Sequence, residues 1–271
     1  MERSLALMCG AGVLPARMAD EARRRGWRVV AFTFDEASEL AGRVDRVVPA
    51  RITALGPVLA ALQEDGISAA LFSGGFSMPD VVRADRGTAD VVARGFETRA
   101  GSRIDARLAD AIIATLAGLG VQVLDQREFL GDWLQGVGCW SARPPTEAEW
   151  GDVRRGLDVA RRMAEARIGQ TVVVRHGAVL AVEAVEGTTE TIRRGGALGG
   201  PGAVVVKAVA RDHDYRFDAP AVGPETLRAA SEAGVAVVAF EADRVLLFDR
   251  QETLRIADTA NIAVVGVDGA G

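Results

Sequence analysis

The sequence predicts an α/β protein, with an amino-terminal Rossmann-like, parallel-sheet domain followed by a second α/β domain. Short valine-rich runs the length of a strand alternate with amphipathic stretches the length of a helix. That alternation is typical of a mostly parallel sheet with helices on both faces. The chain has 271 residues, of which 49% are hydrophobic, so it is long enough for two domains of about 130 residues, each with its own core.

In the first domain, Pro15 suits the first turn of a helix in which Leu14, Met18 and Ala22 share one face. Gly66 is placed to end a second helix. The predicted elements, in chain order, are a strand at 4–8, a turn at 9–12, a helix at 14–25, strands at 28–34 and 47–48, a helix at 54–64, a strand at 68–73, a helix at about 104–119 and a strand at 121–124.

A stretch rich in glycine, serine and proline at 136–145 indicates a linker. We therefore place the first domain at 1–135, the linker at 136–147 and the second domain at 148–271. Thr146 and Glu149 match a capping box for the helix that follows. The predicted elements are a helix to about 166, strands at 171–174 and 179–182, a glycine-rich loop at 194–202, a strand at 203–209, a helix at 223–233, strands at 235–240 and 245–248, a helix at 252–260 and a strand at 262–267.

The composition disfavours several classes of protein. The net charge is −5 and is not concentrated in one tail, which argues against a nucleic-acid partner. No stretch approaches the ~20 apolar residues that cross a bilayer. The amino-terminal stretch 1–15 lacks the pattern of a signal peptide. We expect a soluble, cytoplasmic protein, with peripheral contact to the inner membrane left open.

The cysteines and histidines do not indicate a metal site or covalent catalysis. Cys9 and Cys139 are the only cysteines and have no CxxC or histidine partner in the sequence. We expect both to be free thiols. His176 and His213 are the only histidines, and neither accompanies a recognisable nucleophile elbow. His176 falls at a predicted hairpin turn, where we expect it to be exposed.

Two glycine-rich turns each follow a predicted strand. The first precedes a helix, and backbone N–H groups at a helix N-terminus attract phosphate. The second lies at the edge where open α/β sheets bind ligands. The alternative for both is a plain structural turn, and the dinucleotide fingerprint is incomplete. The candidate nucleotide or phosphate contacts are Gly10, Gly12 and Leu14 in the first turn and Gly74, Gly75 and Ser77 in the second.

Glu183 lies in an apolar strand, where a carboxylate is costly unless it is paired or binds a cation. The plainer interpretation is a structural ion pair with Arg193 or Arg194. The alternative is a ligand pocket that includes residues flanking this strand and its neighbour. The further candidates for such a pocket are Gln170, Glu186, Gly187, Thr188 and Lys207.

Three carboxylates, an arginine and a histidine occur within 212–218. Asp214, Arg216 and Asp218 alternate, so they would share one face of an extended segment. Two carboxylates that flank an arginine can hold Mg²⁺ and a phosphate together. A solvated charged loop is the alternative interpretation of this run.

These segments together are more specific than any one alone. The order is IGQ at 168–170, AVEAVEGT at 181–188, VVVK at 204–207 and DYRFDAP at 214–220. This order resembles the carboxy-terminal domain of the UDP-2,3-diacylglucosamine pyrophosphatase family of the lipid A pathway, the LpxI type. The GAGVLP turn at 10–15 and SGGFSMP at 73–79 are similar to glycine-rich segments of that family's first domain. The resemblance covers essentially the whole chain.

The resemblance implies hydrolysis of UDP-2,3-diacylglucosamine to UMP and 2,3-diacylglucosamine 1-phosphate, with Mg²⁺ or another divalent cation as cofactor. It implies a lipid-linked nucleotide sugar as substrate, held between the two domains. Asp218 matches a position important for catalysis in the family. We expect Asp214 and Asp218 to act on the metal or the attacking water, and Arg216 to contact phosphate. In-line attack on phosphorus needs positioning and charge neutralisation more than a strong side-chain nucleophile.

The sequence departs from the family pattern at several positions. Arg167 and Thr189 stand where aspartates are usual, and Met78 replaces an arginine. Arg103-Ile104-Asp105 keeps one acid of a usual pair, and 210–213 lacks a usual lysine. These departures indicate a diverged member. The alternative to the hydrolase is a non-catalytic or substrate-shifted relative that binds a nucleotide sugar or lipid. A dinucleotide oxidoreductase is disfavoured, and a homodimer is left open.

Overall fold

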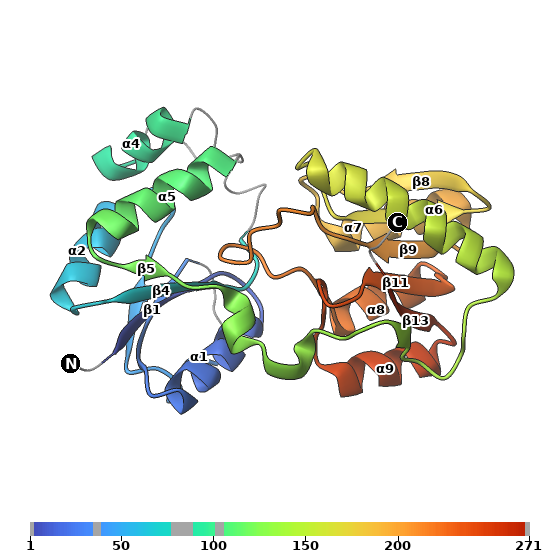
Figure 1. The fold of residues 1–271 in the computed structure, drawn as a ribbon, viewed down its shortest axis with the longest axis horizontal. Helices are drawn as coiled ribbons and strands as arrows, with labels where there is room; N and C mark the ends of the chain where they lie inside the picture. Colours follow the sequence, from blue (N-terminus) through green and yellow to red (C-terminus); the bar gives the residue numbers. More distant parts are fainter. Residues whose placement is uncertain (1–2, 35–38, 77–88, 101–105, 269–271) are drawn as a thin grey trace. The chain divides into compact units, whose positions relative to one another are not determined.

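The computed structural model describes residues 3–34, 39–76, 89–100 and 106–268. The chain forms two compact units (Figure 1). Unit 1 comprises Met1–Leu130 and Asp214–Ala219, and unit 2 comprises Gly131–His213 and Pro220–Gly271. Each unit is a sheet covered by helices, which confirms the predicted α/β class. The domain bounds at 1–135 and 148–271, with a linker at 136–147, stay a prediction.

The sheet of unit 1 has the strand order β3-β2-β1-β4-β5, and every neighbouring pair is parallel. This order matches the doubly wound nucleotide-binding folds, so the predicted Rossmann-like sheet is confirmed. The strands are β1 Ser4–Cys9, β2 Arg28–Thr33, β3 Arg46–Pro49, β4 Ala69–Ser73 and β5 Gln122–Val123.

Helices cover both faces of this sheet, with α1 and α5 on opposite sides (Figure 1). Ala6 and Met8 of β1 pack with Leu62 of α2 and Leu116 of α5 in one buried cluster. The helices of unit 1 are α1 Leu14–Arg24, α2 Gly56–Glu64, α4 Val91–Ala100, α5 Ala106–Gly118 and the short 3₁₀ helix Gln126–Phe129. α4 is not among the predicted helices, because its apolar pattern is broken by Gly95 and by arginines.

The sheet of unit 2 has the order β6-β13-β11-β9-β7-β8. The three central strands β13, β11 and β9 are parallel, and β6, β7 and β8 run antiparallel to their neighbours. β10 and β12 form a separate parallel pair. The strands are β6 Gly138–Cys139, β7 Thr171–Arg175, β8 Ala178–Val182, β9 Val204–Lys207, β10 Ala221–Val222, β11 Val237–Glu241, β12 Leu246–Leu247 and β13 Ala263–Val267.

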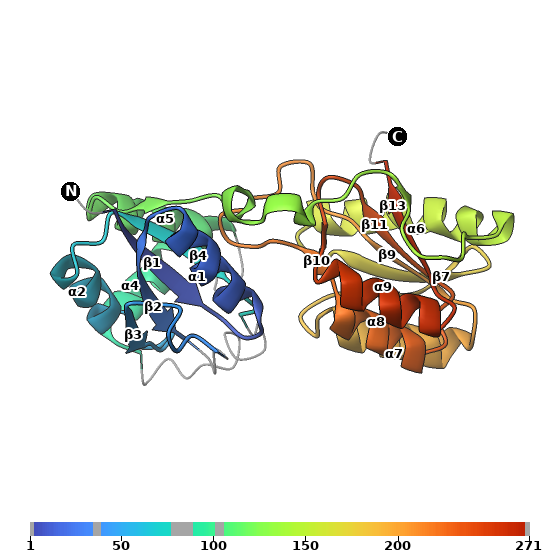
Figure 2. The same ribbon diagram turned by 90° about the horizontal axis from the view of Figure 1, so that it is seen from below.

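In unit 2, α6 covers one face of the sheet, and α7, α8 and α9 cover the other (Figure 2). The two faces carry separate cores: Val153 of α6 packs with Val206, whereas Ile192 of α7 and Leu227 of α8 pack with Val205. The helices are α6 Glu147–Glu165, α7 Thr188–Gly199, α8 Pro224–Glu232, α9 Arg250–Thr259 and the 3₁₀ turn Gly131–Trp133. Among the described residues, no helix combines the length and apolar character needed to cross a membrane.

The predicted capping box of α6 is present. The Thr146 hydroxyl accepts a hydrogen bond from the N–H of Glu149 at 3.3 Å, and the Glu149 carboxylate accepts one from the N–H of Thr146 at 2.7 Å. Two N–H groups that a helix start leaves without partners are therefore satisfied reciprocally.

The predicted glycine-rich loop at 194–202 is wrong, because α7 continues to Gly199. A Cβ on Gly195 would lie 2.6 Å from the Val173 side chain, and one on Gly196 would lie 2.6 Å from Ala233 Cβ. A Cβ on Gly199 would lie 2.3 Å from Leu180. The glycines thus let the helix pack closely on β7, β8 and the end of α8, and this gain outweighs their low helix propensity.

Candidate active site

The two glycine turns of unit 1 lie against each other. The N–H of Gly10 donates to Ser73 O at 2.8 Å, and Ala11 and Gly75 exchange two backbone hydrogen bonds. A Cβ on Gly10 would lie 2.5 Å from the carbonyl oxygen of Gly75, and one on Gly74 would lie 2.6 Å from that of Ala11. This close approach accounts for Gly10 and Gly74 without a ligand.

Gly12 and Gly75 differ, because a Cβ at either position would meet no atom of the described residues within 4 Å. Gly12 has a φ of +93° and is exposed. Leu14, which begins α1, is half-buried, and the residue before it makes no side-chain cap to the helix. The first N–H groups of α1 are therefore left without a side-chain cap. Ser77 lies outside the described residues.

Two buried polar side chains end the strands beneath these turns. Ser73 is 1% exposed, and its hydroxyl has no hydrogen-bond partner among the described residues. Burial raises the pKa of the Cys9 thiol to about 12, so at neutral pH the group is protonated and is not a nucleophile. Cys9 and Cys139 are free thiols, as predicted, and the structure places the first in the interior and the second at the surface.

The segment Asp214–Ala219 is anchored on unit 1 by its two aromatic residues. Phe217 packs against Phe72 of β4, with ring centroids 4.9 Å apart. Tyr215, the only tyrosine of the chain, is 4% exposed. The Arg127 guanidinium lies 4.3 Å from the centre of the Tyr215 ring, and the N–H of Gln126 donates to the Tyr215 carbonyl. These contacts fix the backbone on either side of Arg216 and next to Asp214 and Asp218.

Asp214 and Arg216 form a closed pair on this segment. The carboxylate of Asp214 accepts hydrogen bonds from Arg216 Nε at 2.9 Å and from Nη2 at 2.7 Å. The hydrogen bond with Asp214 raises the pKa of the Arg216 guanidinium, and the nearby charges of Asp110 and Asp125 act in the same direction. Arg216 thus stays charged and is held among carboxylates.

The expectation of one shared face in an extended segment is wrong. The N–H of Phe217 donates to the carbonyl of Asp214, and the N–H of Arg216 donates to the Asp214 side chain at 3.0 Å. The chain therefore turns, as aspartates often cause by bonding the backbone two residues on. Asp214 and Arg216 are half-buried, whereas Asp218 is exposed.

Asp125 is a neighbour of this segment that sequence reasoning missed. Burial raises the pKa of its carboxyl, but two hydrogen bonds and the charge of Arg127 outweigh burial and leave the pKa lowered. The charge of Asp214 acts on Asp125 in the raising direction, which places the two carboxylates within electrostatic reach. Its position directly after a predicted strand, at the carboxyl edge of the sheet, was the available signal.

Unit 2 contains a second polar group, at the end of β9. The Lys207 ammonium donates to the Thr188 hydroxyl at 2.9 Å, and that hydroxyl donates to Glu183 Oε1 at 2.8 Å. The Thr171 hydroxyl lies 3.3 Å from that of Thr188, and the N–H of Gln170 donates to Glu183 Oε2 at 3.2 Å. Four of the predicted pocket residues are therefore brought together, with Thr171 as a fifth member that was not predicted.

The charges of this polar group are balanced within it. Burial raises the pKa of Glu183, but the charge of Lys207 and the hydrogen bonds from Thr171, Thr188 and Gln170 outweigh it and hold the pKa below its ordinary value. Lys207 is 8% exposed and is the only lysine in the sequence. A buried ammonium and a carboxylate are thus linked through a hydroxyl.

Glu186 and Gly187 lie beside this group. Glu186 accepts a hydrogen bond from Arg194 at 2.6 Å, and Gly187 has a φ of +84° where α7 begins. The expected ion pair of Glu183 with Arg193 or Arg194 is wrong, because Arg194 pairs with Glu186 and Arg193 with Glu190. Both arginines are carried by α7, whose second half falls in the loop predicted at 194–202.

Glu241, at the carboxyl end of β11, is a second residue that sequence reasoning missed. It is 1% exposed and forms ion pairs with Arg161 and Arg244, each at 3.3 Å. Its other oxygen accepts from the N–H of Val209 at 2.9 Å. A glutamate at the end of an apolar run was the signal available.

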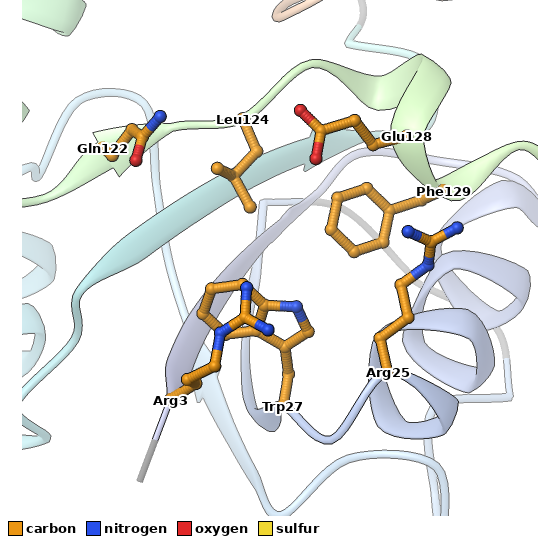
Figure 3. Close-up of a pocket in the computed structure, with 7 residues that line it drawn as sticks. All are labelled: Arg3, Arg25, Trp27, Gln122, Leu124, Glu128 and Phe129. Atoms are coloured by element: carbon orange, nitrogen blue, oxygen red, sulfur yellow. The ribbon is translucent and has the colours of Figure 1, made fainter. Parts of the chain in front are cut away.

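A pocket of about 350 Å³ in unit 1 contains none of the predicted site residues (Figure 3). The Arg3 guanidinium lies 4.0 Å from the centre of the Trp27 ring, and that of Arg25 lies 5.3 Å from the centre of Phe129. Arg3 precedes β1 and Trp27 precedes β2, whereas the glycine turns follow β1 and β4, so these two residues lie at the opposite edge of the sheet from the turns.

The donor set of the 214–218 segment fits a hard divalent cation. Mg²⁺ commonly takes one or two carboxylates from the protein and completes its shell with phosphate oxygens and water. Asp214 and Asp218 supply two such carboxylates. Within the described ranges, no three His, Cys, Asp or Glu side chains gather closely enough to hold a metal without further ligands.

Family models match both halves of the chain. Residues 4–133 match the LpxI N-terminal domain, and residues 136–265 match the LpxI C-terminal domain. The chain is 31% identical over 288 residues to the UDP-2,3-diacylglucosamine pyrophosphatase LpxI of Caulobacter vibrioides, a match that covers 98% of each protein.

Solved structures are less similar. A precorrin-6A reductase, CobK, aligns over 98% of this chain and 88% of its own, with a TM-score of 0.35 and 12% identity. A UDP-glucose-4-epimerase from Stenotrophomonas maltophilia aligns over 44% of this chain and 35% of its own, with a TM-score of 0.29 and 18% identity. At these scores neither likeness carries a conclusion.

Proposed function

The chain belongs to the LpxI family, and from that premise we propose that it hydrolyses the pyrophosphate bond of UDP-2,3-diacylglucosamine to UMP and 2,3-diacylglucosamine 1-phosphate. The observation that carries this proposal is the 31% identity to the Caulobacter pyrophosphatase over 98% of both chains. The residues of the 214–218 segment supply groups suited to the reaction. The role in lipid A synthesis is part of the proposal.

Arg216 is assigned to the phosphates. Its guanidinium is fixed by hydrogen bonds to Asp214 and keeps its charge among carboxylates. A planar guanidinium matches phosphate oxygens and stabilises the charge that develops in phosphoryl transfer. Asp218 is exposed, and we assign it to the attacking water or to the cation.

The cofactor in this proposal is Mg²⁺ or another divalent cation, held by Asp214 and Asp218. When bound, the cation neutralises charge on the pyrophosphate oxygens. Asp214 would then exchange part of its contact with Arg216 for the cation, which leaves guanidinium N–H groups for a phosphate. Asp214 and Arg216 lie in one short turn at 214–217, which is anchored by the packing of Phe217 against Phe72.

The remaining candidate contacts are assigned to binding. The N–H groups at the start of α1, which lack a side-chain cap, are suited to an anionic or ribose oxygen. Ser73 has a buried hydroxyl that lacks a partner among the described residues. In unit 2, the group of Lys207, Thr188 and Glu183 supplies a cation, a hydroxyl and a carboxylate for a sugar or phosphate.

A substrate-shifted or non-catalytic relative is the second candidate, because several family acids are replaced. One replacement has a compensating partner in the structure: Arg167, at a usual aspartate, lies 3.4 Å from Asp212 in an exposed ion pair. This ion pair indicates that the structure accommodates Arg167 locally and that the neighbouring 214–218 segment is retained. The proposed setting is the cytoplasm, with peripheral contact to the inner membrane where a lipid-linked substrate resides, and a homodimer is part of this proposal.

The test is incubation of pure protein with UDP-2,3-diacylglucosamine and Mg²⁺, with UMP measured by mass spectrometry. We expect UMP from the wild type and a loss of more than about 100-fold in Asp218→Ala. Asp212→Ala is the matched control, because it removes a neighbouring exposed aspartate outside the proposed site. Equal UMP from wild type and Asp218→Ala contradicts the role of Asp218. Substrate binding without UMP favours the second candidate.

A further inference from the structure

The stretch from Glu241 to Leu247 contacts both ends of the segment that links β9 to β10. At the entry, the N–H of Val209 donates to Glu241 Oε2 at 2.9 Å. At the exit, the N–H of Leu246 donates to the carbonyl of Pro220 at 2.7 Å, and β12 then pairs with β10. We call residues 209–220 the crossover. Its two ends are therefore held by one short stretch of chain.

The groups around Glu241 hold its carboxylate in position for the contact with Val209. It is 1% exposed, so its charge must be balanced by nearby groups. Arg161 of α6 and Arg244 both reach Oε1 at 3.3 Å, which leaves Oε2 for the N–H of Val209. Two partly buried arginines thus hold a buried carboxylate in one orientation, at the point where the crossover leaves the sheet.

Arg244 extends the contact along the crossover. Its Nη2 donates to the carbonyl of Ala210 at 2.6 Å and to that of Arg211 at 3.1 Å. Glu241 therefore acts on three successive residues: on Val209 directly, and on Ala210 and Arg211 through Arg244. Only two residues separate this contact from Asp214, and only Ala219 separates Asp218 from Pro220.

We infer that Glu241, acting through Arg244 and the N–H of Val209, is a positioning residue for the crossover that carries Asp214, Arg216 and Asp218. Its part in catalysis rests on the proposed function, whereas its part in placing the crossover does not. Misplacing a reacting group by about 1 Å can cost on the order of 100-fold in rate, so a loosened entry is expected to reach the chemistry.

A tyrosine probe separates placement from catalysis. Tyr215 is the only tyrosine, lies within the crossover, and is buried under the Arg127 guanidinium. Protein made with 3-fluorotyrosine therefore gives one ¹⁹F resonance from the segment of interest. In Glu241→Gln we expect this resonance to shift or split. In Glu252→Gln, which alters an exposed ion-paired carboxylate in the same unit, we expect it to stay in place.

Activity supplies the second readout. In Glu241→Gln we expect kcat for UMP release to fall by about 10- to 100-fold, with a smaller change in KM. Arg244→Ala should lower kcat similarly, and Arg244→Lys should recover part of it by restoring a cation. Arg244 is less buried than Glu241. The variants Arg244→Ala and Arg244→Lys therefore provide the test if Glu241→Gln does not fold.

The outcomes are distinct. An unmoved ¹⁹F resonance together with wild-type kcat in Glu241→Gln overturns the inference. A moved resonance with lowered kcat, and neither change in Glu252→Gln, supports it. If the wild type releases no UMP, the proposed function fails and the ¹⁹F resonance alone decides whether Glu241 places the crossover.

Discussion

The carboxylate of Asp214 accepts four hydrogen bonds from Arg216: two from Nε at 2.9 and 3.2 Å, one from Nη2 at 2.7 Å and one from the backbone N–H at 3.0 Å. The acid and the base of this pair are two residues apart, in a turn that is anchored by the aromatic residues on either side of Arg216. The pair thus sets the direction of the one guanidinium that we assign to phosphate.

Asp214→Asn tests this relationship. The amide keeps an oxygen for the backbone N–H of Arg216 but removes the negative charge that orients the guanidinium and is available to a cation. We expect kcat/KM for UMP release to fall by about 100-fold or more, while the free energy of unfolding changes by less than about 1 kcal/mol, because both side chains are substantially exposed. Steady-state kinetics and urea unfolding check the two parts. A large loss of stability with normal turnover points to a structural role.

Gly74 and Gly75 are adjacent but have different roles in the structure. A Cβ on Gly74 would lie 2.6 Å from the Ala11 carbonyl, and its φ is +84°, whereas a Cβ on Gly75 would meet no described atom within 4 Å. We expect Gly74→Ala to destabilise the protein by about 1–3 kcal/mol and Gly75→Ala to stay within about 0.5 kcal/mol of the wild type. Urea unfolding of the two variants is the measurement. Equal stabilities show that the turns are not packed as described.

The pH dependence of stability tests the group around Lys207. The folded-state pKa of Glu183 is lowered despite burial, with Lys207 as the first opposing cause. A lowered folded pKa gives stability that is present above the unfolded value of about 4.3 and is lost as the pH falls through the folded pKa. We expect Lys207→Met to raise the folded-state pKa of Glu183 toward or above the unfolded value, so that protonation of Glu183 causes a smaller loss of stability as the pH falls.

Unfolding free energies between about pH 3 and 7 provide the comparison for wild type and Lys207→Met. Glu190→Gln is the control, because it removes an exposed carboxylate of α7 that pairs only at the surface. Its acid limb should coincide with that of the wild type. If Lys207→Met shows the same acid limb as well, the coupling between Lys207 and Glu183 is absent.

The two cysteines should react very differently. Cys139 is exposed, whereas Cys9 is buried with a thiol pKa of about 12. Ellman's reagent at pH 8 should therefore titrate one thiol per chain quickly in the native state and two after unfolding, because the thiolate is the reacting form. Cys139→Ser should remove the fast reaction. Two fast thiols in the native protein contradict the burial of β1.

The fold was predictable because its strands are short valine-rich runs bounded by turn residues, and local pattern suffices to find such strands. α7 was not predictable in the same way. In the local sequence, its glycines are typical of a loop. Only the positions of the Val173, Leu180 and Ala233 side chains in the structure show why glycine is required there. Tertiary packing thus overrode local propensity.

The candidate site was predictable in composition but not in geometry. Sequence pattern indicated Asp214, Arg216 and Asp218, yet it did not indicate the turn that pairs the first two. Glu183 was identified as a costly carboxylate, but its link to Lys207 through Thr188 joins three separate elements and leaves no mark in any one of them. Glu241 ends β11 and Asp125 comes shortly after β5, and neither belongs to a sequence motif, so only the structure reveals what they contact.

Lys207 is the one lysine among the 32 lysine and arginine side chains, so the protein can be labelled at a single side-chain amine. An amine-selective reagent has one side-chain target, and that target is enclosed, so modification must wait for the Lys207 region to open. The rate of labelling at Lys207 then measures how often this region opens locally in the unmodified protein. Slower labelling in the presence of a nucleotide sugar would show that the sugar occupies this region, and the measurement needs no mutation.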